Sequence, residues 1–138
     1  MRKRAKVIVF EGPDKAGKET QSRLATGALQ RAGARVVRVE VPSKECTRTH
    51  RLIYWMLREG HAKTWPHLFQ FVQFLNKVAF QLFVLPPLLR DHDIVVLDRW
   101  SLSAVVYGDA TGVNRAFGRF LFGLLKVPDL TIVFAERS

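Results

Sequence analysis

The segment Val7–Gln21, VIVFEGPDKAGKETQ, constrains the fold more than any other part of the chain. It opens with apolar residues typical of a buried strand, Val7–Phe10, and helical periodicity begins after Lys18. In between, Gly12, Gly17 and Lys18 fit the pattern G-x-x-x-x-G-K-[ST] up to its last position. Glycines there let successive backbone N–H groups turn toward an anion, and the N-terminus of the following helix adds partial positive charge. The segment therefore predicts a phosphate-binding loop between a strand and a helix.

The residue after Lys18 departs from this pattern. Glu19 stands where a serine or threonine hydroxyl would hold magnesium, and Thr20 comes one place late. Glu19 could point to solvent while other groups hold the metal, or it could ligate the metal itself. Thr20 or Asp98 could contribute, directly or through water, or metal binding could be weakened. Asp98 and Glu19 are therefore the candidate metal ligands.

Short β-like runs alternate with helical stretches along the chain. The runs are 6–10, 34–41, 93–98 and 130–134, and the helical stretches are 19–32, 49–58 and 68–85. Runs that are apolar on both faces suit strands buried between helix layers, and this alternation is typical of a parallel sheet. The sequence predicts one α/β domain over residues 1–138, with helices on both sides of a parallel β-sheet.

The stretch 68–85 is apolar enough to be compared with a membrane span, and it ends before Pro86 and Pro87. Polar residues nevertheless recur along it at spacings of three and four: Gln70, Gln73, Lys77 and Gln81. Such a stripe favours a buried helix with one face on a cleft over a helix in lipid. We therefore expect no membrane contact.

The net charge of +10 is compatible with nucleic acid, anionic lipid or phosphorylated small molecules as partners. It is not concentrated in one run beyond Arg2, Lys3 and Arg4, so charge alone does not choose among these partners. We expect no nucleic-acid partner. Cys46 is the only cysteine, which excludes an internal disulfide and fits a reducing, cytoplasmic location. No signal peptide is visible at the start.

Four landmarks in order resemble the thymidylate kinase family. They are EGPDKAGKETQ (Glu11–Gln21), VEVPSK (Val39–Lys44), LDRWSLSAVVYG (Leu97–Gly108) and PDLTIVF (Pro128–Phe134), and together they cover almost the whole chain. The resemblance implies a P-loop kinase fold, a three-layer sandwich. It also implies transfer of the γ-phosphoryl group of ATP to dTMP with Mg²⁺, and a homodimer. Family members continue into an arginine-bearing lid and a fifth strand, so the chain resembles a member truncated before the lid and last strand.

The same resemblance assigns roles on the phosphate side. Lys18 would reach the outer phosphates, Asp98 would lie near the magnesium shell, and Arg99 would bridge the donor and acceptor phosphates. Lys15 would stabilise the transferring charge or is an exposed turn lysine. The implied catalytic residues are Lys15, Lys18, Asp98 and Arg99. The implied ATP phosphate-binding residues are Gly12, Asp14, Lys15, Ala16, Gly17, Lys18, Glu19 and Thr20.

On the dTMP side the resemblance is less direct. Phe74 is the candidate for stacking on the base and Lys77 for reading it, with Phe71 and Asn76 as other candidates on the same helix. Lys44 stands where the family has an arginine for the monophosphate, although it could be a surface lysine. The implied dTMP-binding residues are Asp14, Lys44, Phe74, Lys77, Arg99, Ser103 and Tyr107. Gln73 could line the same cleft.

Three functions remain open from the sequence. The first is a thymidylate-kinase-like enzyme, and the second is a related protein that binds nucleotide without efficient catalysis. The third is a basic nucleic-acid-binding domain, which would bind with a steep salt dependence.

Overall fold

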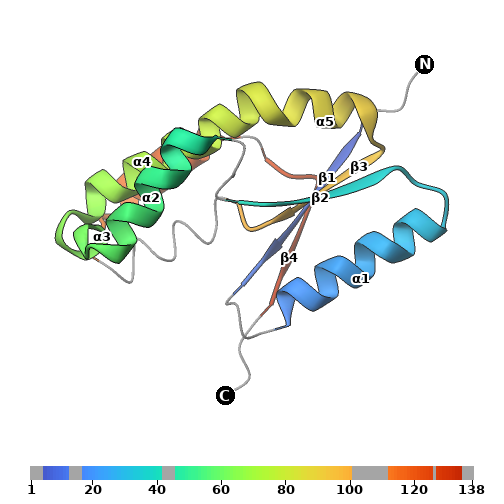
Figure 1. Ribbon diagram of the computed structural model, residues 1–138, viewed down its shortest axis with the longest axis horizontal. Helices are drawn as coiled ribbons and strands as arrows, with labels where there is room; N and C mark the ends of the chain where they lie inside the picture. Colours follow the sequence, from blue (N-terminus) through green and yellow to red (C-terminus); the bar gives the residue numbers. More distant parts are fainter. Residues whose placement is uncertain (1–4, 13–16, 42–45, 101–111, 126, 135–138) are drawn as a thin grey trace.

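The computed structural model describes residues 5–12, 17–41, 46–100, 112–125 and 127–134. Its strands are β1 (Lys6–Glu11), β2 (Val36–Glu40), β3 (Ile94–Asp98) and β4 (Leu130–Val133). They form one sheet in the order β2-β3-β1-β4, and every neighbouring pair is parallel (Figure 1). The four β-like runs of the sequence all form strands, which confirms the α/β prediction.

The register of the strands brings polar residues together at one edge of the sheet. Asp98 at the end of β3 lies opposite Phe10 of β1 on one side and Glu40 of β2 on the other. Glu11 ends β1. Carboxyl ends of parallel strands form the edge where ligands of open α/β sheets bind. The fold therefore positions these side chains at the expected binding edge.

Helices cover both faces of the sheet and create three layers. Helix α1 (Lys18–Arg31) packs Ala25 and Leu29 against the core formed by Phe10, Val36 and Val96. The opposite face is covered by the π-helical segment η2 (Phe80–Val84), α5 (Leu85–Asp91) and α7 (Arg115–Gly123). The larger core lies on this second face. The three-layer sandwich predicted from the resemblance is confirmed.

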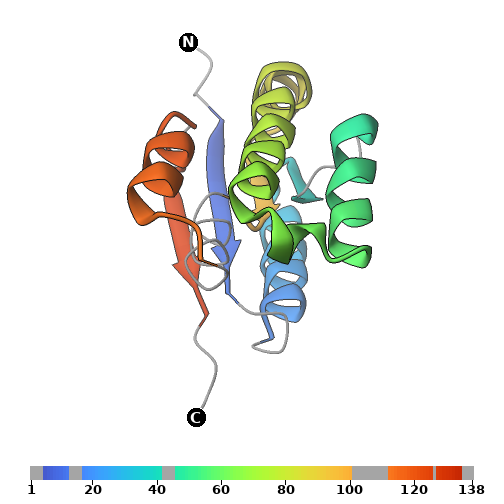
Figure 2. The same ribbon diagram turned by 90° about the vertical axis from the view of Figure 1, so that its left-hand side faces the viewer.

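A separate helical group extends from one end of the sheet (Figures 1 and 2). It consists of α2 (Thr47–Arg58), α3 (His61–Thr64) and α4 (Pro66–Ala79). A small core of its own holds the three helices together: Ile53, Met56, Ala62, Phe69 and Val72. Asn76 of α4 also donates a hydrogen bond from Nδ2 to Oγ1 of Thr49 in α2, over 2.9 Å. This group carries the candidate base-binding helix.

The predicted end of the long helix before Pro86 is wrong, because helical structure continues to Asp91. A proline interrupts an α-helix by removing an i→i−4 hydrogen bond and by clashing with the preceding turn. Here the chain passes through the π-turns of Phe80–Val84, and Pro86 and Pro87 then occupy the start of α5. Proline is tolerated at the first positions of a helix. The local change of helix type thus accommodates both prolines.

The continuous helical stretch Pro66–Asp91 is long and apolar enough to cross a bilayer by length and composition alone, with 39% of its most apolar window buried inside the protein. Core helices of soluble proteins pass the same test. In this helix Gln70, Asn76 and Lys77 are buried in the protein. That burial of polar groups is the arrangement expected for a core helix rather than a lipid-facing one.

Candidate active site

The two glycines of the loop adopt backbone conformations that other residues rarely take. Gly12 follows β1 with φ 142°, and Gly17 precedes α1 with φ 83°. A Cβ atom at Gly12 would lie 2.6 Å from the carbonyl oxygen of Phe134, so the loop leaves β1 in direct backbone contact with the end of β4. The strand, the glycines and the helix thus occur in the predicted order, which is the context that a phosphate loop requires.

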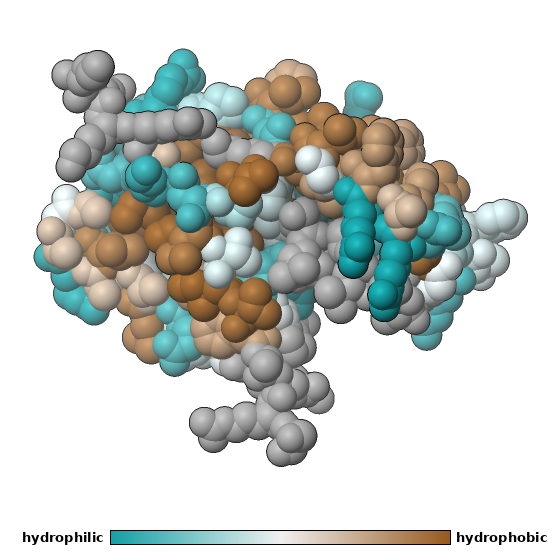
Figure 3. Space-filling view, turned by 180° about the vertical axis from the view of Figure 1, so that it is seen from behind, coloured by the Kyte–Doolittle hydropathy of each residue, from teal (hydrophilic) through white to brown (hydrophobic). Residues whose placement is uncertain are grey.

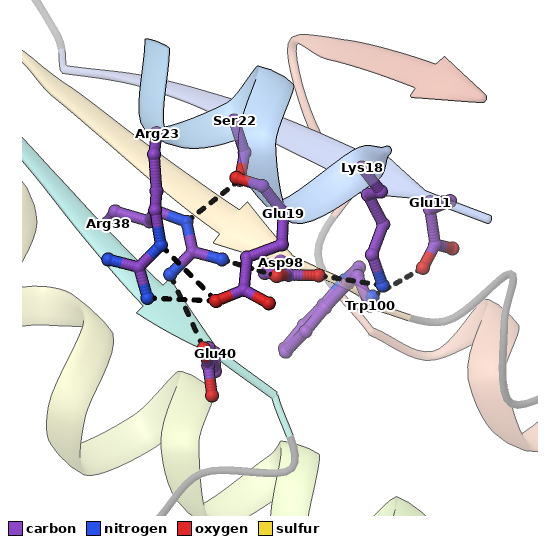
Figure 4. Close-up of polar contacts among 9 residues, drawn as sticks. All are labelled: Glu11, Lys18, Glu19, Ser22, Arg23, Arg38, Glu40, Asp98 and Trp100. Atoms are coloured by element: carbon purple, nitrogen blue, oxygen red, sulfur yellow. Dashed lines mark hydrogen bonds and ion pairs between the residues drawn. The ribbon is translucent and has the colours of Figure 1, made fainter. Parts of the chain in front are cut away.

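Four side chains meet behind this loop, and we call them the Asp98 cluster: Lys18, Ser22, Arg38 and Asp98 (Figure 4). Nζ of Lys18 lies 2.9 Å from Oδ1 of Asp98, and a guanidinium nitrogen of Arg38 lies 2.5 Å from Oδ2. Nε of Arg38 donates to Oγ of Ser22 over 2.8 Å. One carboxylate therefore lies between two cations.

The charged side chains of the Asp98 cluster are almost fully shielded from solvent. The side chains of Lys18 and Asp98 are 3% and 9% exposed, and that of Arg38 is 11% exposed. Coulomb attraction between close charges is stronger here than at a surface, and an unpaired charge would be correspondingly costly. The arrangement places two positive charges next to the loop, with one cation on each oxygen of the single Asp98 carboxylate.

Arg99 and Trp100 continue from β3 through a sharp change in backbone direction. Arg99 has φ 73°, and among the described residues it is the one non-glycine residue with positive φ. Its N–H donates to the carbonyl of Phe10 over 2.8 Å, and the Trp100 N–H donates to Oε1 of buried Glu11 over 2.7 Å. Strained backbone held by such bonds is characteristic of functional sites. These hydrogen bonds to β1 thus fix the backbone position of Arg99 at the end of β3.

Glu19 and Thr20 lie on the exposed part of the first turn of α1. Glu19 accepts hydrogen bonds from Arg23, over 3.0 Å from Nη2 and 3.3 Å from Nε, and both side chains are 61% exposed. The Glu19–Arg23 pair follows the i,i+4 spacing of a helix surface. The metal-ligand role of Glu19 stays a prediction, and the contact that the structure gives it is this surface pair.

The base-side candidates come together around Phe122 of α7. The ring of Phe74 meets that of Phe122 edge to face at 6.1 Å, and Nζ of Lys77 lies 5.6 Å from the centre of the Phe122 ring. Burial lowers the pKa of Lys77 from 10.5 to about 8, and the negative charge of Glu11 partly opposes that shift. The same Glu11 carboxylate is also the acceptor for the Trp100 N–H.

The remaining predicted positions are distributed as follows. Phe71 is exposed and lies 6.3 Å from Phe74 between ring centres, Gln73 is half-buried, and Asn76 is engaged with Thr49. Six predicted site residues lie outside the described residues: Asp14, Lys15, Ala16, Lys44, Ser103 and Tyr107. Their roles stay predictions.

The sequence prediction did not include three polar residues that the structure brings to the site: Glu11, Ser22 and Arg38. The sequence did contain a hint of the role of Arg38. Arg38 lies two residues after Val36 on the same strand, so both side chains lie on the same face of the sheet, and Val36 is buried against α1. A charged residue on a buried strand face calls for a specific partner. Glu11 is likewise an acidic residue at the carboxyl end of a buried strand.

One buried carboxylate beside the phosphate loop, that of Asp98, could hold a divalent cation. The described residues contain no group of three or more His, Cys, Asp or Glu side chains that could hold a metal ion. Magnesium in kinase sites is commonly bound by one or two carboxylates together with substrate phosphates and water. Asp98, a buried carboxylate beside the phosphate loop, fits that requirement.

A parallel sheet in the order 2-3-1-4, a glycine-flanked loop after the first strand and a lysine opening the next helix define a P-loop nucleotide-binding fold. The family model described as thymidylate kinase matches residues 10–136. The chain belongs to the thymidylate kinase family.

Individual relatives agree with this assignment. The chain is 30% identical over 127 residues to a protein of Pyrobaculum aerophilum named "Probable thymidylate kinase", and 31% identical over 131 residues to a thymidylate kinase of Dehalococcoides mccartyi. Each match covers 91% of this chain and 62% of the relative. The crystal structure of a thymidylate kinase from Ehrlichia chaffeensis is similar in fold, with a TM-score of 0.78 at 24% identity, over 98% of this chain and 78% of that one.

Proposed function

We propose that the chain binds ATP and dTMP and transfers the γ-phosphoryl group to dTMP, giving dTDP. The observation that carries the proposal is the Lys18–Asp98 pair, which lies at the binding edge of the sheet beside the glycine loop of a thymidylate kinase family member. The chain spans 62% of the length of the curated relatives named above, so the activity of the whole protein is part of the proposal.

Phosphoryl transfer requires mainly positioning and stabilisation of the migrating charge. Lys18 leaves Asp98 and binds the outer phosphates of ATP, and Arg99 bridges the two substrates with its planar guanidinium. Lys15 adds positive charge from within the loop, while Asp14 accepts from the 3′-hydroxyl of the sugar. These last two roles rest on the family resemblance.

Asp98 is the residue that would hold Mg²⁺, because the departure of Lys18 leaves Oδ1 available to a cation. Magnesium, when bound, neutralises charge on the phosphates of the donor. Arg38 remains on Oδ2 and keeps the carboxylate in place.

Phe74 and Lys77 form the base side of the proposed site. Phe74 offers a ring face for stacking, and Lys77 offers a donor to a carbonyl oxygen of the base. Tyr107, Ser103, Lys44 and half-buried Gln73 would complete the contacts to the sugar and monophosphate. The effect of the Glu11 charge on the pKa of Lys77 supports this placement, since Glu11 ends β1.

We also infer a homodimer in the cytoplasm. Leu68, Phe71 and Leu75 of α4 are exposed at spacings of three and four, and Phe120 of α7 and Leu124 directly after this helix are exposed as well. Helices α4 and α7 are neighbours, as the 5.4 Å ring contact between His67 and Phe117 shows. The space-filling view from behind also shows broad hydrophobic areas (Figure 3). Exposed apolar surface of this kind is typical of a protein interface.

A coupled assay of nucleoside diphosphate formation tests the function. We expect turnover with dTMP, ATP and Mg²⁺ that exceeds turnover with dUMP or dGMP, and loss of at least about a hundredfold in kcat for Arg99→Met. If calorimetry detects ATP or dTMP binding but no dTDP forms, the second candidate function, nucleotide binding without catalysis, replaces the first. Exposed Glu19 in place of the loop hydroxyl is the observation that favours this second candidate.

A further inference from the structure

Arg38 has no role in the proposed reaction, yet it contacts three other side chains in and beside the Asp98 cluster. It contacts Ser22 of α1 at 2.8 Å, Asp98 of β3 at 2.5 Å and Glu40 of its own strand at 3.4 Å. Three elements therefore meet at one guanidinium. A planar fork held on two sides is well suited to fix the position of a carboxylate.

The charges around Lys18 explain why a second cation is needed there. Lys18 must leave Asp98 before it can bind a phosphate, and Asp98 is only 9% exposed. A buried carboxylate that loses its one counter-charge suffers a large desolvation cost. Because Arg38 occupies the other oxygen of Asp98, Lys18 can depart without leaving that carboxylate unpaired.

We propose that Arg38 is a positioning residue that holds Asp98 and thereby releases Lys18 for the phosphates of a nucleotide. The proposal rests on the phosphate-binding part of the proposed function. Arg38 acts through Asp98, and Ser22 keeps the guanidinium in the correct orientation. Without Arg38, Lys18 would be the one cation paired with Asp98 among the described residues, and it would bind phosphate less readily.

Calorimetric titration with ATP in EDTA tests this proposal on the chain as it stands. We expect Arg38→Met to weaken ATP binding about tenfold, a size within the range of coupling energies between contacting charges. Arg38→Lys keeps the charge but loses the fork, and should recover part of the affinity. Arg35→Met is the matched control, because Arg35 forms a comparable pair with Asp93 that is about half exposed. Its dissociation constant should stay within about twofold of that of the original chain.

A double-mutant cycle separates positioning from a direct effect on the ligand. In an Asp98→Asn background the carboxylate that Arg38 positions is gone, so adding Arg38→Met should change ATP affinity by less than about twofold. A tenfold loss that persists in this background would show that Arg38 acts directly on the phosphates and would overturn the proposal. An Arg38→Met protein that binds ATP as tightly as the Arg35→Met control would also overturn it, as would an original chain that fails to bind ATP.

Ser22→Ala keeps the proposal testable if the Asp98 variants unfold. This change removes the hydroxyl that accepts from Nε of Arg38 and alters no charge. We expect an intermediate loss of ATP affinity, about threefold, with thermal unfolding showing a folded protein; an unchanged dissociation constant contradicts the positioning role. The dTMP turnover assay remains a separate measurement. If the cycle shows coupling but no dTDP forms, the proposed function fails while the role of Arg38 stands. If dTDP forms but the cycle shows no coupling, the role of Arg38 fails while the proposed function stands.

Discussion

Lys77 is the described residue whose ionisation the fold changes most clearly. Burial lowers its pKa from 10.5 to about 8, so the folded protein releases this proton at a lower pH than the unfolded chain does. Between about pH 8 and pH 10.5 the unfolded state binds more protons, and stability therefore rises with pH across that window. Below pH 8 the charged form is buried at a cost, which the shift puts at up to about 3 kcal/mol.

Lys77→Met should accordingly stabilise the protein at neutral pH. We expect the free energy of unfolding at pH 7 to increase by about 1–3 kcal/mol, because an apolar side chain of similar length replaces a buried cation. The gain should shrink as the pH rises toward 10.5, and chemical denaturation at pH 7 and pH 10 measures it. Lys63→Met on the surface of α3 is the control and should change stability by less than about 0.5 kcal/mol at both pH values. A destabilised Lys77→Met protein at pH 7 would show that the Phe122 and Glu11 contacts outweigh burial.

The backbone of Arg99 allows a second comparison between single residues. At φ 73°, glycine is free of the steric cost that any side chain with a Cβ atom incurs. Arg99→Gly should therefore be more stable than Arg99→Ala by about 1 kcal/mol, although both lose the guanidinium that the proposed phosphoryl transfer requires. Urea unfolding of the two variants measures this difference. Equal stabilities would mean that the turn relaxes when the side chain is removed.

Among the secondary-structure elements, the junction between β1 and β4 is the tightest point beside the loop. Gly12→Ala would place a Cβ atom 2.6 Å from a backbone oxygen of Phe134, which no side-chain rotation can relieve. We expect a loss of about 2–4 kcal/mol in the free energy of unfolding. Gly17→Ala is the matched control: its φ is also positive, but its Cβ atom would meet nothing within 4 Å, so the loss should be about 1 kcal/mol. Similar losses for both variants would contradict this close approach.

The strands were more predictable from sequence than the helices. Runs such as 93–98 are apolar on both faces, and burial between two layers leaves them few alternatives. The end of the long helix was mispredicted because a π-turn before Pro86 is set by packing rather than by local preference. Helices α3 and α7 were not predicted. For α7 a capping signal existed, since Asn114 accepts from the N–H groups of Ala116 and Phe117.

The site divides in the same way. Lys18 belongs to one short motif and Asp98–Arg99 to another, and the family resemblance implied that the two motifs form one site. Arg38 comes from a different strand, and its partnership with Asp98 depends on β2 lying next to β3 in the sheet. Strand order is a tertiary property that no local pattern determines. The sequence indicated that Arg38 needs a partner, but it could not show that this partner is Asp98.

For the whole molecule, the exposed apolar face of α4 provides a test of the dimer. Phe71→Glu combined with Leu75→Lys should convert a dimer into a monomer, because charges would be buried in an apolar interface. Light scattering at several concentrations measures the mass. Leu24→Glu is the control, since Leu24 is equally an exposed apolar residue but lies on α1, away from α4 (Figure 1). A stable monomer for the original chain would contradict the inference, and so would a variant that remains dimeric.

The Lys18–Asp98 pair has a further consequence for a chain whose formal charge is +10. A site lined by bare cations would attract any small anion in its surroundings, including chloride and acetate. Here Lys18 is already paired with the carboxylate of Asp98, so an incoming anion must compete with Asp98 for the lysine. A singly charged ion offers no more than Asp98 does, whereas a polyphosphate presents several negative oxygens at once. We therefore expect the Lys18–Asp98 pair to favour binding of polyphosphates over binding of singly charged anions.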